Sequence, residues 1–309
     1  MKRFRFLFYI LVSLLYLSGC DFVALDDATL NGPTLAIVAP NGEIFVGDGY
    51  YNSRIAVFSP EGKFLRSWGE RGFASGQIQN PHGITFTPYN DIVIADRDNG
   101  RIQLFSLAGK YLKQIHSEQL GRPWAVACDS AGFIYAVDGG DQDEQNPRSG
   151  ITKLNQQGKI VAQFSKFGSN IGELNWGHAI AVDPAGMQIY VADLKNNRVQ
   201  KFVPYNLENT VYGVDTSFSQ STGSISEPPL GICYSAGKLY VGYDKSDEPI
   251  WVFDAKSGNL INKIAAGKFE RPHGISVDNS GYIWVTDVEQ NKVFKITTTG
   301  DILLTLGAQ

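Results

Sequence analysis

The chain has 309 residues, of which 43% are hydrophobic and 12% aromatic, so it can bury a sizeable core. Its 27 Lys and Arg residues are outnumbered by 31 Asp and Glu residues, and this mildly acidic balance excludes the basic surface of a nucleic-acid-binding domain. Short runs rich in Val, Ile, Tyr and Phe, with 33 glycines in the chain, favour strands over helices.

The N-terminal residues have the pattern of an export signal. Three basic residues lie within residues 2–5, and they precede the apolar run 6–17. That run is shorter than the roughly 20 residues that a membrane-spanning helix needs. It leads into Leu-Ser-Gly-Cys ending at Cys20, which resembles a bacterial lipoprotein cleavage box. We therefore predict a lipoprotein signal peptide over 1–19, a lipid on Cys20, and a linker over 20–32.

These predictions describe an exported protein that is lipid-anchored to a membrane of the bacterial cell envelope, in the periplasm or at the cell surface. The alternative interpretation of the same segment is an ordinary signal peptide, or a buried strand, in which Cys20 occurs by chance.

Residues 33–309 repeat one pattern six times. Each repeat begins with Pro or Gly and a short β run, at Pro33, Pro81, Pro123, Gly177, Pro229 and Pro272. A turn and three further β runs follow, such as EIFVGD, RIAVFS and GKFLRSWG in the first repeat. Four strands per repeat of about 40 to 50 residues are typical of propeller blades. The sequence therefore predicts an all-β, six-bladed β-propeller over 33–309, with no strand exchanged between the first and last blades.

An aspartate stands where the second strand of most repeats is expected to end, at Asp48, Asp96, Asp138, Asp193 and Asp287. An asparagine and a basic residue follow it, as in Asn99 with Arg101 or Asn197 with Arg198. We interpret these residues as turn-forming groups whose side chains bind nearby backbone. The pattern is similar to that of NHL repeats.

Three of the four histidines occupy the same position in alternate repeats: His82, His178 and His273. Their spacings are 178 − 82 = 96 and 273 − 178 = 95 residues, which is two repeats each. Alternate blades of a six-fold ring are related by three-fold rotation, so three imidazoles at an axial position would meet at one point. Three neutral imidazoles with an open position are typical of a catalytic zinc site. The alternative is that each imidazole makes only a local hydrogen bond near its strand.

Two further candidates follow the aspartates of the first two repeats, namely Tyr50 and Arg97. If their loops share the histidine end of the channel, a phenol next to a cation or a metal has its ionised form favoured and can act as a base. The alternative is exposed loop packing. The acidic loop 138–144 lacks EF-hand spacing, so we expect a solvated loop there rather than a calcium site.

Segments 48–55 (DGYYNSRI), 95–103 (ADRDNGRIQ) and 272–288 resemble, in permuted order, the peptidyl-α-hydroxyglycine α-amidating lyases, also called peptidylamidoglycolate lyases. The resemblance implies a six-bladed propeller with one zinc ion in its channel, and a reaction that splits a carbinolamide into an amide and glyoxylate. It also assigns roles to individual residues. The zinc ligands would be His82, His178 and His273, the catalytic tyrosine Tyr50, and an active-site arginine Arg97. Arg97 would stabilise the phenolate or bind the substrate carboxylate.

The resemblance is weaker at the substrate-binding residues. The family has a second substrate-binding arginine where this chain has a short loop, and Lys245 is its expected, weak counterpart. A methionine of the family is replaced by Trp176, and a calcium-binding aspartate by Ala179, so calcium is not expected.

Two other functions compete with a zinc-dependent lyase acting on a peptidyl-α-hydroxyglycine or a related carbinolamide. One is a non-catalytic NHL-repeat lipoprotein that binds a protein or another envelope component, because propellers host many functions. The other is a metal-dependent lactonase-like hydrolase. We rank it last, because such propellers use carboxylate and asparagine ligands rather than three histidines.

Overall fold

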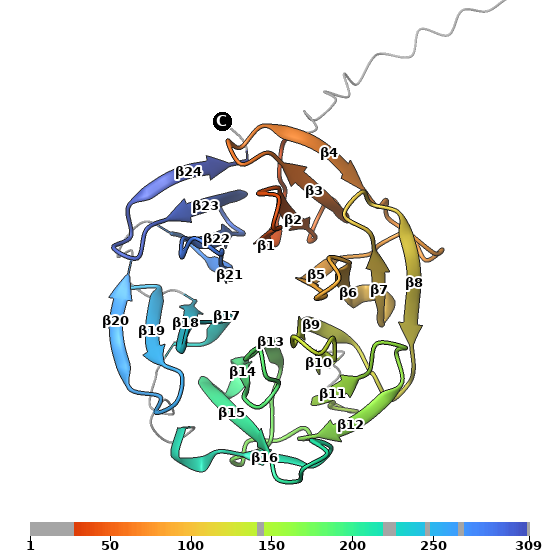
Figure 1. The fold of residues 1–309 in the computed structure, drawn as a ribbon, viewed down its shortest axis with the longest axis vertical. Coiled ribbons are helices and arrows are strands. Elements are labelled where there is room, and N and C mark those ends of the chain that lie inside the picture. The colour runs from red at the N-terminus through yellow and green to blue at the C-terminus, as the bar shows by residue number, and fades with distance from the viewer. Residues whose placement is uncertain (1–27, 141–144, 219–226, 245–247, 265–268, 308–309) are drawn as a thin grey trace, which may run out of the picture.

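The computed structural model describes residues 28–140, 145–218, 227–244, 248–264 and 269–307. These residues form six four-stranded antiparallel sheets around a central axis (Figure 1). The predicted all-β, six-bladed propeller is therefore confirmed. Predictions for Cys20, for Lys245 and for residues 141–144 fall outside the described residues. In the part of the chain that is described, no helix is long and apolar enough to span a membrane.

The strands of each blade follow one another from the axis to the rim (Figure 1). Blade 1 comprises β1 (Pro33–Val38), β2 (Ile44–Asp48), β3 (Arg54–Phe58) and β4 (Phe64–Trp68). Blade 2 comprises β5 (Pro81–Phe86), β6 (Ile92–Asp96), the 3-10 helix η1 (Arg97–Asn99), β7 (Arg101–Phe105) and β8 (Tyr111–His116). Blade 3 comprises β9 (Pro123–Cys128), β10 (Ile134–Asp138), β11 (Gly150–Leu154) and β12 (Ile160–Phe164).

The second half of the ring repeats this plan. Blade 4 comprises β13 (Gly177–Val182), β14 (Ile189–Asp193), the 3-10 helix η2 (Leu194–Asn196), β15 (Arg198–Pro204) and β16 (Tyr212–Val214). Blade 5 comprises β17 (Pro229–Ser235), β18 (Lys238–Tyr243), β19 (Ile250–Asp254) and β20 (Leu260–Ile264). Blade 6 comprises β21 (Pro272–Val277), β22 (Ile283–Asp287), β23 (Lys292–Ile296) and β24 (Ile302–Leu306).

The core lies between the blades. Second strands such as β2 and β6 are buried at every residue, because each is packed on both faces by neighbouring blades. Their sequences are accordingly almost continuous apolar runs. Outer strands such as β4 alternate between half-buried and exposed residues, as expected for a sheet with one face in water. One cluster unites Phe45 and Ile55 of blade 1 with Ile94 of blade 2, and equivalent clusters join the other blades.

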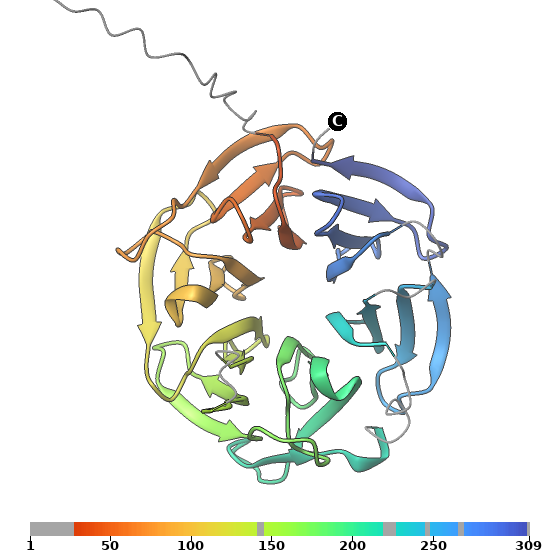
Figure 2. The same ribbon diagram turned by 180° about the vertical axis from the view of Figure 1, so that it is seen from behind.

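The ring closes by packing and hydrogen bonds between two complete blades. Blade 1 and blade 6 each contain four consecutive strands and lie side by side in both views (Figures 1 and 2). The side-chain oxygen of Asn291 accepts the Gly32 N–H at 2.7 Å, and the Thr286 hydroxyl donates to the Thr34 carbonyl at 3.0 Å. Closure therefore exchanges no strand, as the sequence predicts.

The recurring aspartate side chain stabilises the turn that precedes the axial strand. Asp96, which is buried, accepts hydrogen bonds from the Gln79 N–H at 2.7 Å, Asn99 Nδ2 at 2.9 Å and Arg101 Nε at 2.7 Å. The turn-forming interpretation is thus confirmed for this motif. In blade 4 the residue that bonds Asp193 is Asn196, whereas Asn197 has a left-handed backbone and ends η2. The Asp96 bond to Gln79 holds the chain directly before β5, where the functional site begins.

Candidate metal centre and active site

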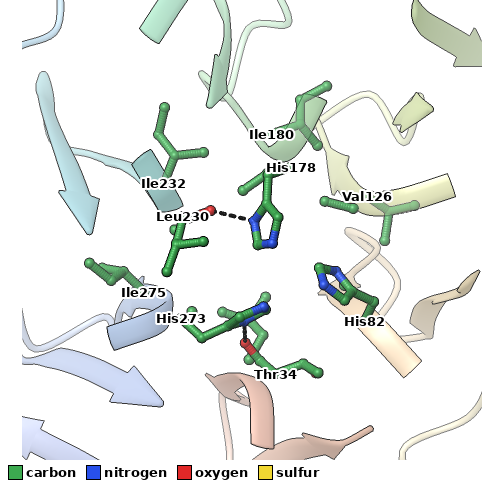
Figure 3. A pocket seen from close by; sticks show the side chains of 15 residues that line it. Thr34, His82, Val126, His178, Ile180, Leu230, Ile232, His273 and Ile275 are labelled. Carbon is green, nitrogen blue, oxygen red and sulfur yellow. Dashed lines mark hydrogen bonds between the residues drawn. The ribbon is translucent and has the colours of Figure 1, made fainter. Parts of the chain in front are cut away.

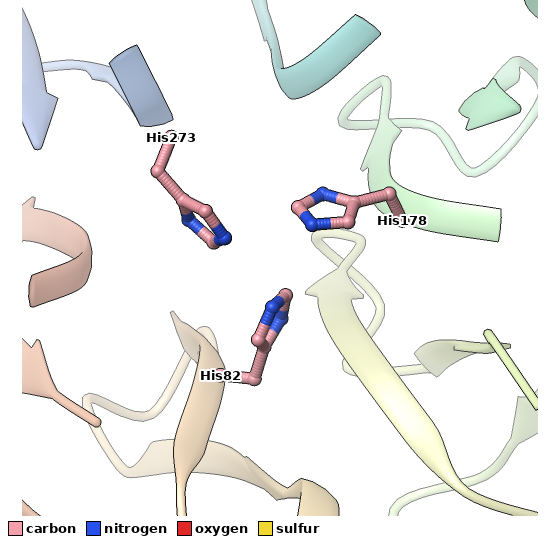
Figure 4. Close-up of side chains that lie close together, drawn as sticks. All are labelled: His82, His178 and His273. Carbon is pink, nitrogen blue, oxygen red and sulfur yellow. The ribbon is translucent and has the colours of Figure 1, made fainter. Parts of the chain in front are cut away.

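His82, His178 and His273 are the second residues of the axial strands β5, β13 and β21, and their rings point toward one another (Figure 4). The ring centroids are 4.9, 4.9 and 4.8 Å apart, which is close to an equilateral triangle. One potential ligand atom of each ring lies within 4.8 Å of the others, and all three residues are buried. The three imidazoles therefore converge, as their spacing in the sequence predicts.

Each imidazole is oriented by the main chain of the next blade. The Nδ1 atoms of His82, His178 and His273 lie 2.8, 2.8 and 2.9 Å from the carbonyl oxygens of Trp124, Leu230 and Thr34, and two of these bonds are drawn in Figure 3. A carbonyl only accepts, so each Nδ1 carries the proton and each Nε2 keeps its lone pair. The local hydrogen bond posed as the alternative to metal binding thus exists, and it prepares Nε2 as a ligand.

The glycine after two of these histidines allows the close approach between blades. A Cβ on Gly274 would lie 2.2 Å from the Thr34 carbonyl oxygen, and a Cβ on Gly83 would lie 2.6 Å from the Ala125 Cα. A side chain at Gly83 or Gly274 would therefore require the neighbouring axial strand to shift. In blade 4, Ala179 occupies the equivalent position and His178 still makes its Nδ1 bond. The Pro-His-Gly sequence is therefore explained by the packing of one axial strand on the next.

The electrostatics keep the three imidazoles neutral. Burial lowers the pKa of His82 and His178 well below its usual range, and that of His273 to about 4. The positive charge of Arg97 lowers all three pKa values further. Neutral imidazoles with free Nε2 lone pairs are the form that binds divalent transition metals, and zinc suits such a donor set. The residues present therefore fit a metal ion.

Tyr50 covers this centre from the loop side. Its hydroxyl lies 3.2 Å from His82 Nε2 and 2.9 Å from His273 Nε2. The Arg97 guanidinium carbon lies 5.5 Å from the Tyr50 ring centroid and 4.9 Å from that of Trp124. The structure thus places Tyr50 and Arg97 at the histidine end of the channel.

Two opposing effects act on the pKa of Tyr50: the neighbouring cations favour the phenolate, as expected, and burial disfavours it. Burial raises the pKa of the Tyr50 phenol, and the opposing positive charges of Arg97 and Arg271 do not compensate. The phenol is therefore protonated when the imidazoles hold no cation.

A pocket large enough for a small ligand lies on the loop side of the three histidines. Its volume is about 280 Å³, and it is lined by Tyr50, Tyr51, Arg97, Trp124, Trp176, His178, Leu194, Leu230, Arg271, His273, Val288 and Glu289. On the strand side the cavity is only about 40 Å³, and side chains such as Val126, Ile180, Ile232 and Ile275 line it (Figure 3). The larger of the two spaces beside the imidazoles therefore lies on the side of Tyr50 and the two arginines.

Arg271 is one of the pocket residues that sequence reasoning missed. It directly precedes Pro272-His273, and its Nε lies 3.4 Å from an oxygen of Asp244. A terminal nitrogen of its guanidinium lies 3.5 Å from an oxygen of Glu289. Lys245 was expected to supply a second cation from the blade 5 loop, and it lies outside the described residues. The available signal was the place of Arg271 immediately before a repeat that carries an axial histidine.

Comparisons with known proteins identify relatives of this chain. The family model described as NHL repeat matches residues 79–105 and 269–296. Peptidyl-alpha-hydroxyglycine alpha-amidating lyase 1 of Drosophila melanogaster is 32% identical over 231 residues, covering 67% of this chain and 42% of that protein. Peptidyl-glycine alpha-amidating monooxygenase of Mus musculus is 36% identical over 181 residues, covering 55% of this chain and 18% of that protein. The chain thus resembles the amidating lyases, and it aligns with less than half the length of each of these two relatives.

Among solved structures, virginiamycin B lyase from Staphylococcus aureus superposes with a TM-score of 0.61 at 16% identity, covering 92% of this chain and 86% of that one. At this level of identity the superposition establishes the shared propeller fold alone.

Proposed function

We propose that this protein is a zinc-dependent lyase that cleaves a peptidyl-α-hydroxyglycine, or a related N-acyl carbinolamide, to an amide and glyoxylate. One observation carries the proposal: the Tyr50 hydroxyl lies within hydrogen-bond distance of two of the three converging Nε2 atoms. Three candidate metal ligands and a candidate base therefore lie at one end of one pocket. The similarity to the amidating lyases supports the same chemistry.

The Nε2 atoms of His82, His178 and His273 would hold the ion. When bound, zinc supplies Lewis acidity that favours ionisation of a substrate hydroxyl and of the adjacent phenol. The three Nδ1–carbonyl bonds hold the rings in this orientation without using the ligand atoms.

The charged side chains of the pocket orient the substrate. A carbinolamide of this class carries a carboxylate, a hydroxyl and an acylated nitrogen on one carbon. Arg271 lines the pocket, and its ion pairs with two acidic residues, among the residues that the structure describes, are long, at 3.4 and 3.5 Å. It can therefore bind the carboxylate. Arg97 packs against Tyr50 and favours the phenolate.

Tyr50 then acts as the base. The phenolate oxygen takes the proton of the substrate hydroxyl, and the electron pair of that O–H bond forms the carbonyl of glyoxylate. The C–N bond breaks, and the amide nitrogen takes a proton from Tyr50, which restores the phenolate. Atoms and charge balance without any oxidant, since the products are the amide and glyoxylate.

The test uses purified untagged protein, its zinc content per chain, and α-hydroxyhippurate as substrate. Zinc near one per chain together with glyoxylate release is the expected result. Zinc without product would reject this substrate class. The absence of both zinc and product would favour the non-catalytic NHL-repeat lipoprotein that binds a partner.

The N-terminal segment completes the proposal. We propose that the chain is exported and anchored through a lipid on Cys20, in a bacterial cell envelope. The motif at Cys20 supports this location, and a protein partner there remains compatible with the NHL repeats.

A further inference from the structure

Trp176 adopts a backbone conformation that its residue type disfavours. Its φ is 59°, in the left-handed region that Gly and Asn tolerate best. The matching residue of blade 2 is Asn80, with a φ of 64°. Both carbonyls serve the same turn: that of Asn80 accepts the Arg97 N–H at 3.2 Å, and that of Trp176 accepts the Leu194 N–H at 3.1 Å. The local structure therefore calls for a residue such as asparagine, and the strain of a tryptophan there points to a role outside the turn.

Trp176 packs against a second, rigid tryptophan. The ring centroids of Trp124 and Trp176 are 5.6 Å apart at an interplanar angle of 51°. Trp124 is held by a hydrogen bond of 3.1 Å from its indole N–H to the Gly140 carbonyl. Gly139 makes room for the indole, because a Cβ there would lie 2.3 Å from it. The two indoles therefore lie against each other in a fixed arrangement, which we call the Trp124–Trp176 corner.

The corner belongs to the pocket that contains the metal centre. The Trp124 ring centroid lies 5.4 Å from that of His82 and 5.5 Å from that of His178. Leu194 and Leu230 extend the apolar lining. Trp124 comes from blade 3 and Trp176 from the entry to blade 4, whereas Arg271 enters blade 6, across the axis (Figure 1).

We propose that Trp124 and Trp176 form an aromatic subsite that selects the acyl group of the substrate. The inference rests on the proposed function and specifies its substrate class. A carbinolamide with its carboxylate on Arg271 and its hydroxyl at Tyr50 directs its acylated nitrogen toward blades 3 and 4. The preferred substrates are N-acyl-α-hydroxyglycines with a planar aromatic group next to the scissile C–N bond. Two fixed indoles bind such a group by stacking and by exclusion of water.

The experiment measures equilibrium binding of two unreactive ligands, hippurate and N-acetylglycine, to zinc-loaded protein by calorimetry. Both lack the hydroxyl, so binding does not depend on turnover. We expect hippurate to bind about tenfold more tightly than N-acetylglycine. The ratio of the two Kd values should fall to near one in Trp176→Asn. This substitution introduces the residue type that Asn80 supplies at the matching position of blade 2. The melting temperature of Trp176→Asn should equal or exceed that of the parent, because the backbone strain is relieved.

Phe73→Ala is the matched control, since Phe73 is an exposed aromatic residue outside the pocket. It should preserve the ratio of Kd values. Retention of the ratio in Trp176→Asn, or equal binding of both ligands by the parent, would overturn the aromatic subsite. Tryptophan-dependent hippurate binding without glyoxylate release from α-hydroxyhippurate would support the subsite and reject the lyase. Glyoxylate release without a benzoyl preference would reject the subsite alone.

Discussion

His273 Nδ1 lies 2.9 Å from the Thr34 carbonyl oxygen, so the hydrogen bond that sets the tautomer of one candidate metal ligand also joins the last blade to the first. The Thr286 hydroxyl donates to the same oxygen at 3.0 Å. The candidate metal centre and the closure of the ring therefore depend on a shared contact. Occupation of the centre should stabilise the whole propeller, because ligands on three alternate blades resist their separation.

Zinc should raise the melting temperature, and a chelator should lower it. Binding to the native state alone adds about 4 kcal/mol at a free metal concentration 1,000 times Kd. Differential scanning calorimetry with zinc and with EDTA checks this. His82→Ala should lose both the bound metal and the shift. His116→Ala should keep them, since His116 lies on the exposed edge strand β8. Metal retained by His82→Ala would contradict the ligand set.

Replacing the Tyr50 hydroxyl should separate catalysis from metal binding. Tyr50→Phe removes the proposed base and should lower kcat for glyoxylate release by roughly 100- to 10,000-fold. The zinc content should stay at the parental level, because the three imidazoles are unchanged. Tyr89→Phe, which removes an exposed phenol outside the pocket, is the control. Parental kcat in Tyr50→Phe would exclude Tyr50 as the base.

Arg271 should determine substrate affinity. Arg271→Met removes the charge that binds the carboxylate and should raise KM roughly 10- to 100-fold. Arg271→Lys should recover part of the loss, because it restores the charge without the planar fork. Steady-state kinetics of both variants, with Arg71→Met as an exposed control, test this. An unchanged KM in Arg271→Met would place the carboxylate elsewhere.

The metal-free protein should lose stability as the pH falls from about 6.5 to about 4. Burial depresses the pKa of the three axial histidines, to about 4 for His273, below the usual value of 6.5. Between these values the unfolded chain binds up to three more protons than the native protein, so stability falls by up to about 4 kcal/mol per pH unit. Urea titrations across this range measure the slope.

His178→Gln should reduce the slope of the unfolding free energy against pH by about 1.4 kcal/mol per pH unit, which is the contribution of one proton. Equal slopes in the His178 variant and the parent would show that these imidazoles do not carry the pH dependence.

Cys20 should control membrane association. Cys20→Ala abolishes the proposed lipidation site and should move the exported protein from the membrane to the soluble fraction. Fractionation and mass spectrometry of the mature N-terminus check this. Membrane association that survives in the variant would reject the lipid anchor.

The sequence by itself determined the architecture and the convergence of His82, His178 and His273. Both follow from periodicity: six equivalent repeats must pack around one axis, and equivalent positions in alternate repeats are related by symmetry. Tertiary structure alone decided the features that do not repeat. The tautomer of each imidazole depends on a carbonyl of the next blade, and the raised pKa of Tyr50 depends on burial by several loops. Trp124 occupies the axial position that the histidines hold in alternate blades, so its place also follows from the repeat. Arg271 and Trp176 lie in the turns just before β21 and β13, and the direction of their side chains depends on contacts across blades.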